Sequence, residues 1–219
     1  KDKIFRVATG VTANLATIKK AIECKADALI VHHGLFWNKD DYCIQGVKRE
    51  KIKLLLENNL SLFAYHFPMD KHEEIGNNWR AARELGWTQL EPFGFYNGNF
   101  IGVKGIIDPT SPQELKKKLE NYYTHHATTA FGGPEVITKI ALISGGSHKS
   151  LVEGARHGLD AFITGSFDEP NWYQAEEEKI NFFAMGHSAT ERIGPKALAE
   201  HLQKSLNIPC EFIDVYNPF

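Results

Sequence analysis

Residues 5–34 of the chain read FRVATGVTANLATIKKAIECKADALIVHHG, and residues 138–167 repeat the same pattern as TKIALISGGSHKSLVEGARHGLDAFITGSF. The two stretches align without a gap. Each contains a short apolar run, a turn of small residues, apolar residues at helical spacing, and Asp-Ala followed by a second apolar run. Each stretch therefore predicts a strand, a turn, a helix and a second strand, and we interpret the pair as an internal duplication.

The similarity extends beyond both stretches. Residues 49–66 predict a helix, an Asn-rich stop and a strand that ends in a histidine, and residues 171–187 predict the same order. Continuous apolar strands that alternate with helices pair mostly in parallel, with helices covering the sheet. We therefore predict an α/β fold of two related lobes, residues 1–97 and 98–219, which can be interwoven within one continuous domain.

The region between the repeats predicts one strand and one capped helix. Residues 98–107 have the composition of a strand, and the helix follows them. Ser111 is a suitable N-cap, Pro112 suits the first turn, and Glu114 completes an S/T-x-x-E capping box. The preceding stretch PFGFYNGNF, residues 92–100, has the composition of a loop.

The composition narrows the class of protein. The 219 residues are 42% hydrophobic and 24% charged, which is typical of a soluble globular domain. The net charge of −2 argues against a nucleic-acid partner. No apolar run approaches the roughly 18 residues of a membrane span, so we expect no membrane association.

The cysteines indicate a cellular compartment, and the first residue indicates a missing segment. Cys24, Cys43 and Cys210 are widely spaced without a CxxC pair, which argues against a disulfide framework or a thiolate zinc site and favours a reducing cytoplasm. The chain opens on Lys1 and runs at once into a predicted strand, so we expect an N-terminal segment to be missing from it.

Metal-capable side chains follow the predicted strands. In parallel α/β sheets, ligands bind at the carboxyl ends of the strands. The residues at these ends are His32 and His33, then His66 and Asp70, then Gly165, Ser166 and Asp168, and finally His187 and Glu191. Because corresponding positions of both halves carry imidazoles or carboxylates, the pattern predicts a metal site.

The local spacings refine this prediction. A helix is expected to begin near Ser188, so His187 and Glu191, four residues apart, would share one face and reach one ion. Adjacent histidines at a strand end can diverge toward two different ions, which favours a two-metal site over a one-metal site. Taken alone, His32 and His33 would more often be surface or satisfied core residues than metal ligands. YHFPMD is expected to be a loop because of its proline.

Other features allow two interpretations each. His125 and His126 follow a helix rather than an apolar strand, and we interpret them as ordinary polar residues. The SGGS at residues 144–147 could hold a phosphate at the start of a helix, although it more often marks a tight turn. Phe36 and Trp37 could stack on a base, although packing in a core or interface is commoner.

Four segments, in this order and spacing, resemble the Nif-three-like family, whose members are also named GTP cyclohydrolase I type 2 homologues. They are VHHGLFW (31–37), YHFPMDKHEEIGNN (65–78), FITGS (162–166) and GHSATERIG (186–194). The resemblance covers essentially the whole chain and corresponds to the compact bacterial form. It implies two related α/β lobes with a pair of divalent metal ions in the cleft between them, and a ring-shaped homohexamer, a trimer of dimers.

The resemblance also implies the residues of the site. The metal ligands would be His32, His33, Asp70, His187 and Glu191, with the two carboxylates as bridges between the ions. A family histidine near the metals matches His66. A ligand set of imidazole and carboxylate without sulfur suits zinc, iron, manganese, cobalt or nickel.

The activity that this ligand set implies is metal-dependent hydrolysis, because paired ions activate water for attack on an electrophile. By resemblance the substrate would be a nucleotide such as GTP, with His66 or His72 as the proton shuttle. Two alternatives share the same ligands: a metal chaperone or metal-handling protein without turnover, and a ring-shaped interaction protein. No sequence feature recognises guanine.

Overall fold

The structure is a computed structural model that describes residues 3–219, and its residues form two compact units. Unit 1 contains the described residues up to Met69 together with Gly194–Tyr216, and unit 2 contains Asp70–Ile193 with Asn217–Phe219. These bounds differ from the lobes predicted at 1–97 and 98–219. The difference arises because a late strand pairs with the first strand, while residues 70–97 contribute to the second sheet.

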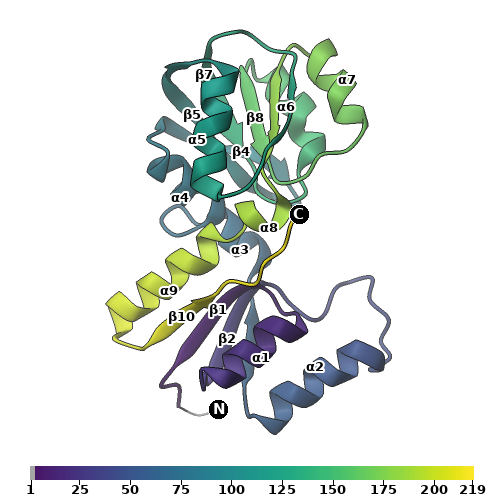
Figure 1. The fold of residues 1–219 in the computed structure, drawn as a ribbon, viewed down its shortest axis with the longest axis vertical. Helices are drawn as coiled ribbons and strands as arrows, with labels where there is room; N and C mark the ends of the chain where they lie inside the picture. Colours follow the sequence, from purple (N-terminus) through teal and green to yellow (C-terminus); the bar gives the residue numbers. More distant parts are fainter. Residues whose placement is uncertain (1–2) are drawn as a thin grey trace. The chain divides into compact units, whose positions relative to one another are not determined.

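Unit 1 is built on a four-stranded, all-parallel sheet with the order β10-β1-β2-β3. Its elements are β1 (Val7–Thr12), α1 (Leu15–Glu23), β2 (Ala28–His33), α2 (Gly46–Glu57), β3 (Ser61–Ala64), α9 (Ile193–Leu206, in unit 1 from Gly194) and β10 (Cys210–Ile213). Figure 1 shows α1 and α2 on the same side of this sheet.

Side chains of β1 alternate between two covered faces of the sheet. Ala8 belongs to a buried cluster with Ile18 of α1 and Leu55 of α2. The neighbouring Thr9 faces the other way, where its hydroxyl donates to the carbonyl oxygen of Pro195 in α9 at 2.8 Å. Helices therefore pack on both faces, as the continuous apolar strands predicted.

Unit 2 is built on a six-stranded mixed sheet with the order β4-β5-β7-β8-β9-β6. Its strands are β4 (Thr88–Tyr96), β5 (Asn99–Thr110), β6 (Thr128–Phe131), β7 (Ile137–Leu142), β8 (Ala161–Thr164) and β9 (Asn181–Ala184). Its helices are α4 (Asn77–Glu84), α5 (Pro112–Tyr123), the 3-10 turn η1 (His148–Ser150), α6 (Leu151–Arg156), α7 (Pro170–Glu177) and α8 (His187–Thr190). The short helix α3 (His66–Lys71) joins the two units.

The prediction of mostly parallel strands holds for the all-parallel sheet and for β7, β8 and β9, whereas the outer strands of unit 2 are antiparallel. The stretch 92–100, predicted as a loop, forms the ends of β4 and β5 instead. Asn97 and Gly98 turn the chain with φ of 46° and 81°. Two positive φ values at Asn-Gly are the mark of a two-residue hairpin, so this loop prediction was wrong.

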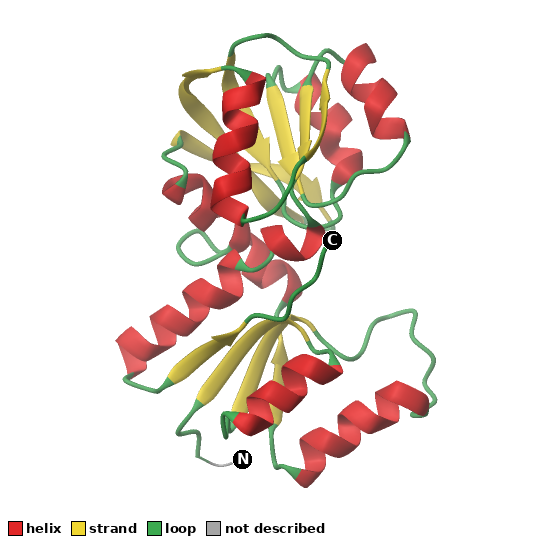
Figure 2. Ribbon diagram, viewed as in Figure 1, coloured by secondary structure: helices red, strands yellow, loops and turns green. Residues whose placement is uncertain are grey.

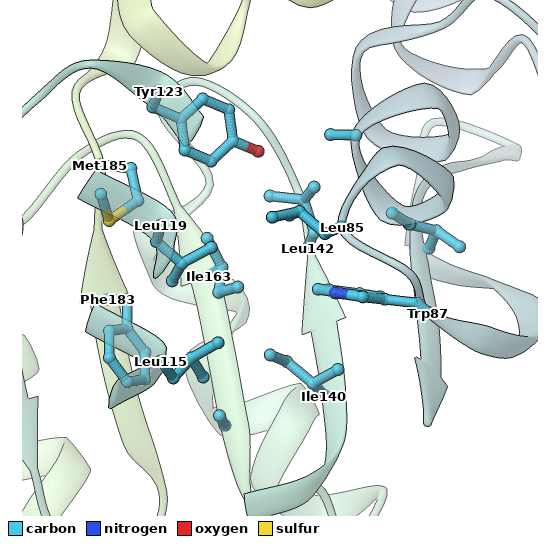
Figure 3. Close-up of a cluster of buried hydrophobic side chains, with 14 of the residues drawn as sticks. Leu85, Trp87, Leu115, Leu119, Tyr123, Ile140, Leu142, Ile163, Phe183 and Met185 are labelled. Carbon is cyan, nitrogen blue, oxygen red and sulfur yellow. The ribbon is translucent and has the colours of Figure 1, made fainter. Parts of the chain in front are cut away.

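The core of unit 2 lies between the sheet and helices α4 and α5 (Figure 3). Ile163 and Phe183 face this core with Leu119 of α5. Phe162 is fully buried on the opposite face, where a methyl group at Gly154 of α6 would lie 3.7 Å from its Cβ. The predicted capping box on α5 is confirmed, because Ser111 and Glu114 each accept the other's backbone N–H at 3.2 Å.

The two repeats have the same strand register. Val7 of β1 pairs with Ala28 of β2, and Ile140 of β7 pairs with Ala161 of β8. Val7 and Ile140 hold one position of the sequence alignment, and the two alanines hold another. This equivalence supports the interpretation as a duplication, which stays a prediction.

The Asp-Ala shared by the repeats also has the same structural role in both. Asp27 Oδ2 accepts the backbone N–H groups of residues 5–6 at 2.6 and 3.0 Å. Asp160 Oδ2 accepts those of residues 138–139 at 2.9 and 2.8 Å. Asp27 therefore fixes the chain just before β1, and Asp160 fixes the start of β7.

Among the described residues, none of the helices has the length and apolar character to cross a membrane.

We expect Asp160→Ala to lower the free energy of unfolding by about 1–3 kcal/mol, because backbone N–H groups lose a charged acceptor. Asp160→Asn should lower the free energy of unfolding by less, since its amide oxygen can still accept hydrogen bonds from these N–H groups. Urea denaturation followed by circular dichroism measures the difference, with the exposed Asp108→Ala in β5 as control. Equal stability of Asp160→Ala and the control would refute this structural role.

Candidate metal centre

Unit 1 brings three histidines together. His32 and His33 are the last residues of β2, and His66 is the first residue of α3. The ring of His32 lies 4.5 Å from that of His33 and 4.7 Å from that of His66, measured between centroids. One ring nitrogen from each histidine lies within 4.8 Å of the others, so a single ion could bind all three.

The prediction that His32 and His33 part toward two different ions stays a prediction, and another detail of the sequence analysis was wrong. YHFPMD, predicted as a loop, contains the start of helix α3, so His66 and Asp70 stand four residues apart on one helix. The proline did not prevent this because Pro68 lies in the first turn, where no backbone N–H is needed.

Hydrogen bonds within unit 1 hold the two strand-end histidines. His32 is only 1% exposed, and its Nδ1 lies 3.4 Å from the carbonyl oxygen of Tyr65. Nδ1 of His33 lies 3.0 Å from the hydroxyl of Thr12, the residue paired with it across β1 and β2. Both imidazoles are therefore oriented from their Nδ1 side.

Phe36 and Trp37 lie in the loop between β2 and α2, whose path Figure 2 shows. The ring of Trp37 lies 5.2 Å from that of His66, edge to face, and 5.8 Å from that of His33. Trp37 and Phe36 are 45% and 69% exposed, so neither is a core residue in this chain. Trp37 shields one side of the histidine group while leaving much of its indole open to solvent.

Unit 2 places the predicted pair His187 and Glu191 side by side. His187 begins α8 and Glu191 is its C-cap, and His187 Nε2 lies 3.3 Å from Glu191 Oε1. The prediction that the two side chains share a face is confirmed. Glu191 is 3% exposed, and a carboxylate so deeply buried interacts strongly with any nearby cation.

The SGGS turn encloses this pair. Gly145 has φ of 67°, and a methyl group there would lie 2.2 Å from Glu191 Oε1. A methyl group on Gly146 would lie 3.3 Å from a ring carbon of His187. The sequence analysis treated these glycines as turn residues, whereas their missing side chains make room for the candidate ligands.

Asp70 is held by neutral donors of unit 2. Its Oδ1 accepts the amide of Asn77 and the hydroxyl of Ser144, each at 3.0 Å. Asn78 accepts the backbone N–H of Ser144 at 2.7 Å and donates to the carbonyl oxygen of Ile101. The two asparagines were not predicted as site residues, although IGNN lies in the segment that carried the family resemblance. Asn77 holds the carboxylate of Asp70, while Asn78 donates to its backbone carbonyl oxygen at 3.3 Å.

The strand end at residues 165–168 contributes one contact to the site. The Ser166 hydroxyl lies 3.2 Å from His187 Nδ1. Asp168 lies instead 3.9 Å from His148 Nε2, and its backbone N–H donates to Asn171. Of the acidic and polar residues predicted here, Ser166 therefore touches a candidate ligand, while Asp168 belongs to the neighbouring turn.

Other histidines have different surroundings. His72 is exposed, and its Nδ1 accepts the backbone N–H groups of Glu74 and Ile75 at 3.2 and 3.4 Å. His125 lies against the carbonyl oxygens of His126 and Pro218. Neither His72 nor His125 is among the three histidines grouped in unit 1 of the described chain.

The cysteines of the described chain lie outside the candidate ligand groups. Burial raises the pKa of Cys24 and raises that of Cys210 to about 11, so both thiols stay protonated near neutral pH. Cys43 is exposed in the loop before α2. The donors that the described residues gather are therefore imidazole nitrogens and carboxylate oxygens.

The chain is similar to proteins of one family. The family model described as Duf34/NIF3 (NGG1p interacting factor 3) matches residues 1–218. A relative from Chlamydia muridarum, named GTP cyclohydrolase 1 type 2 homolog, is 46% identical over 220 residues, or 99% of this chain and 86% of the relative.

Solved structures agree with this match. One described as protein ybgI, of unknown function, has a TM-score of 0.93 and 37% identity, covering 100% of this chain and 87% of that one. TTHA1606 from Thermus thermophilus has a TM-score of 0.90 and 31% identity, with the same coverage.

Gly145→Ala should displace the Glu191 carboxylate and reduce the divalent metal content of the purified protein. Gly158→Ala is the matched control, because Gly158 has φ of 68° and no atom within 4 Å of an added methyl group. Both variants should lose about 1–2 kcal/mol of stability from the left-handed backbone. Elemental analysis and thermal unfolding separate the effects, and equal metal content in the two variants would contradict this role of Gly145.

Proposed function

Because the chain belongs to the Duf34/NIF3 family, we propose that it is a dinuclear divalent-metal protein that hydrolyses a nucleotide such as GTP. The ligands proposed are His32, His33, Asp70, His187 and Glu191. The observation that carries the proposal is the donor set: imidazoles and buried carboxylates, each oriented within its own unit. The name of the Chlamydia relative supports the choice of nucleotide.

The residues fit divalent cations on chemical grounds. Imidazole nitrogen and carboxylate oxygen together suit zinc, iron, manganese, cobalt or nickel. The carboxylates of Asp70 and Glu191, when ionised, would compensate much of the charge of two divalent ions. His66 is close enough to the strand-end histidines to join them as a ligand.

The metal pair, when bound, would supply Lewis acidity and a nucleophile formed from water at neutral pH. The chain itself would orient the ligands and restrict solvent. The indole of Trp37 covers part of the histidine group and presents a flat face beside it. A proton-shuttle role for His66 or His72 stays a prediction, as do assembly into a ring-shaped hexamer and a cytoplasmic location.

We expect protein purified without chelators to carry close to two divalent ions per chain. Replacing both His187 and Glu191 by alanine should empty at least one site, because a nitrogen and a carboxylate donor are lost together. Inductively coupled plasma mass spectrometry gives the count, with the exposed His201→Ala on α9 as control. Wild-type protein that contains no divalent metal would refute the metal site.

The hydrolase activity needs a separate test. Metal-loaded protein should convert at least one member of a nucleotide panel that includes GTP, and chelation or the double alanine variant should abolish the product seen by liquid chromatography. A panel without any metal-dependent product would refute the hydrolase while leaving the metal site intact. Rapid transfer of the ions to a competing chelator would then favour the metal-handling alternative.

A further inference from the structure

Two adjacent aromatic residues in the loop between β2 and α2 have different neighbours. The indole of Trp37 lies 5.8 Å from the ring of His33 and 5.2 Å from that of His66, between centroids. Phe36 instead lies beside Lys48 of α2, whose Nζ is 4.9 Å from the centroid of its ring. The loop therefore places the indole of Trp37 next to the candidate ligands of unit 1, and the ring of Phe36 against a cation.

The turn that carries Trp37 is held by polar contacts of the loop itself. The backbone N–H of Trp37 donates to Asp40 Oδ2 at 3.2 Å, and the backbone N–H of Asp40 donates to the carbonyl oxygen of Trp37 at 3.0 Å. Lys48 Nζ donates to the carbonyl oxygen of Asp41 at 3.0 Å and lies 3.8 Å from Asp40 Oδ2. These contacts tie the loop to α2, so the indole is in position before a ligand arrives and little conformational entropy is lost on binding.

The chemistry of the indole selects the part of a ligand that it contacts. The Trp37 side chain is 45% exposed, so its ring system offers a ligand a large apolar surface beside the histidine group. The faces of an aromatic ring carry partial negative charge, which disfavours phosphate oxygens and favours other aromatic rings in offset or edge-on contact. Of the parts of a nucleotide, the base is the flat aromatic one, and bases stack strongly on aromatic side chains.

We propose that Trp37 binds the base of a nucleotide substrate by stacking and holds it beside the histidine group. The inference rests on the proposed function, because it presumes a nucleotide substrate, and it adds which part of that substrate unit 1 contacts. Every base has a π-face, so stacking alone does not distinguish guanine from adenine. Trp37 therefore makes the site selective for nucleotides over phosphate esters that lack an aromatic ring.

The test compares two substitutions of similar size at one position. Trp37→Phe keeps a flat aromatic ring, whereas Trp37→Leu keeps an apolar side chain without one. Trp172→Leu is the matched control, because Trp172 lies on α7 of unit 2 and is 51% exposed. Each variant is loaded with metal, and steady-state kinetics give kcat and KM for a nucleotide that the wild-type protein converts.

We expect Trp37→Leu to raise KM by about 5–100-fold, the usual effect of losing a base–aromatic stack. Because stacking binds substrate and transition state alike, kcat should change by less than about threefold. Trp37→Phe and Trp172→Leu should stay near the wild-type values. The nucleoside that corresponds to the substrate should inhibit the Trp37→Leu variant more weakly by the same factor as KM, whereas inhibition by inorganic triphosphate should be unchanged.

Three kinetic results would overturn the inference: a wild-type KM in Trp37→Leu, equal losses in Trp37→Leu and Trp37→Phe, or equal weakening of the nucleoside and inorganic triphosphate. Loss of metal from Trp37→Leu, measured by elemental analysis, would assign the indole to the metal group instead. A changed oligomeric state in sedimentation velocity would assign it to an interface between copies of the chain. These failures appear only in the variants, whereas wild-type protein that converts no nucleotide would overturn the proposed function as well.

Discussion

Both sheets depend on one kind of contact, in which an aspartate carboxylate accepts backbone N–H groups at the first strand of a repeat. Asp27 accepts two successive N–H groups just before β1, and Asp160 accepts two at the start of β7. The register of each of these strands beside its parallel neighbour determines where the neighbour ends. Since a shift of one residue would turn every side chain to the other face, the placement of His33 opposite Thr12 follows from it.

Small residues and polar groups surround the candidate ligands. Glycines at 145 and 146 leave room for Glu191 and His187, while an amide and a hydroxyl hold Asp70. Such donors orient a buried carboxylate, and a buried carboxylate interacts strongly with a nearby cation.

Much of the fold and of the candidate site could be predicted from the sequence, because these features depend on local periodicity. The duplicated strand–helix–strand pattern, the capping box at Ser111 and the shared face of His187 and Glu191 all follow from spacing along the chain. The helix at His66 was missed because proline was taken as a breaker where a first turn tolerates it. The hairpin at Asn97–Gly98 was missed although Asn-Gly between apolar residues is its usual signal. The crowding of Gly145 by Glu191 joins residues far apart in sequence, so no local pattern could reveal it.

The path of the chain through the units bears on how the protein is made. β10 is the last strand in the sequence, yet it lies at the edge of the unit 1 sheet next to β1. During synthesis, β1, β2 and β3 leave the ribosome before β10 and must wait for it to complete their sheet. All six strands of unit 2 emerge in the interval. Because domains tend to fold as they are synthesised, the middle of the chain can reach its final structure before the beginning does.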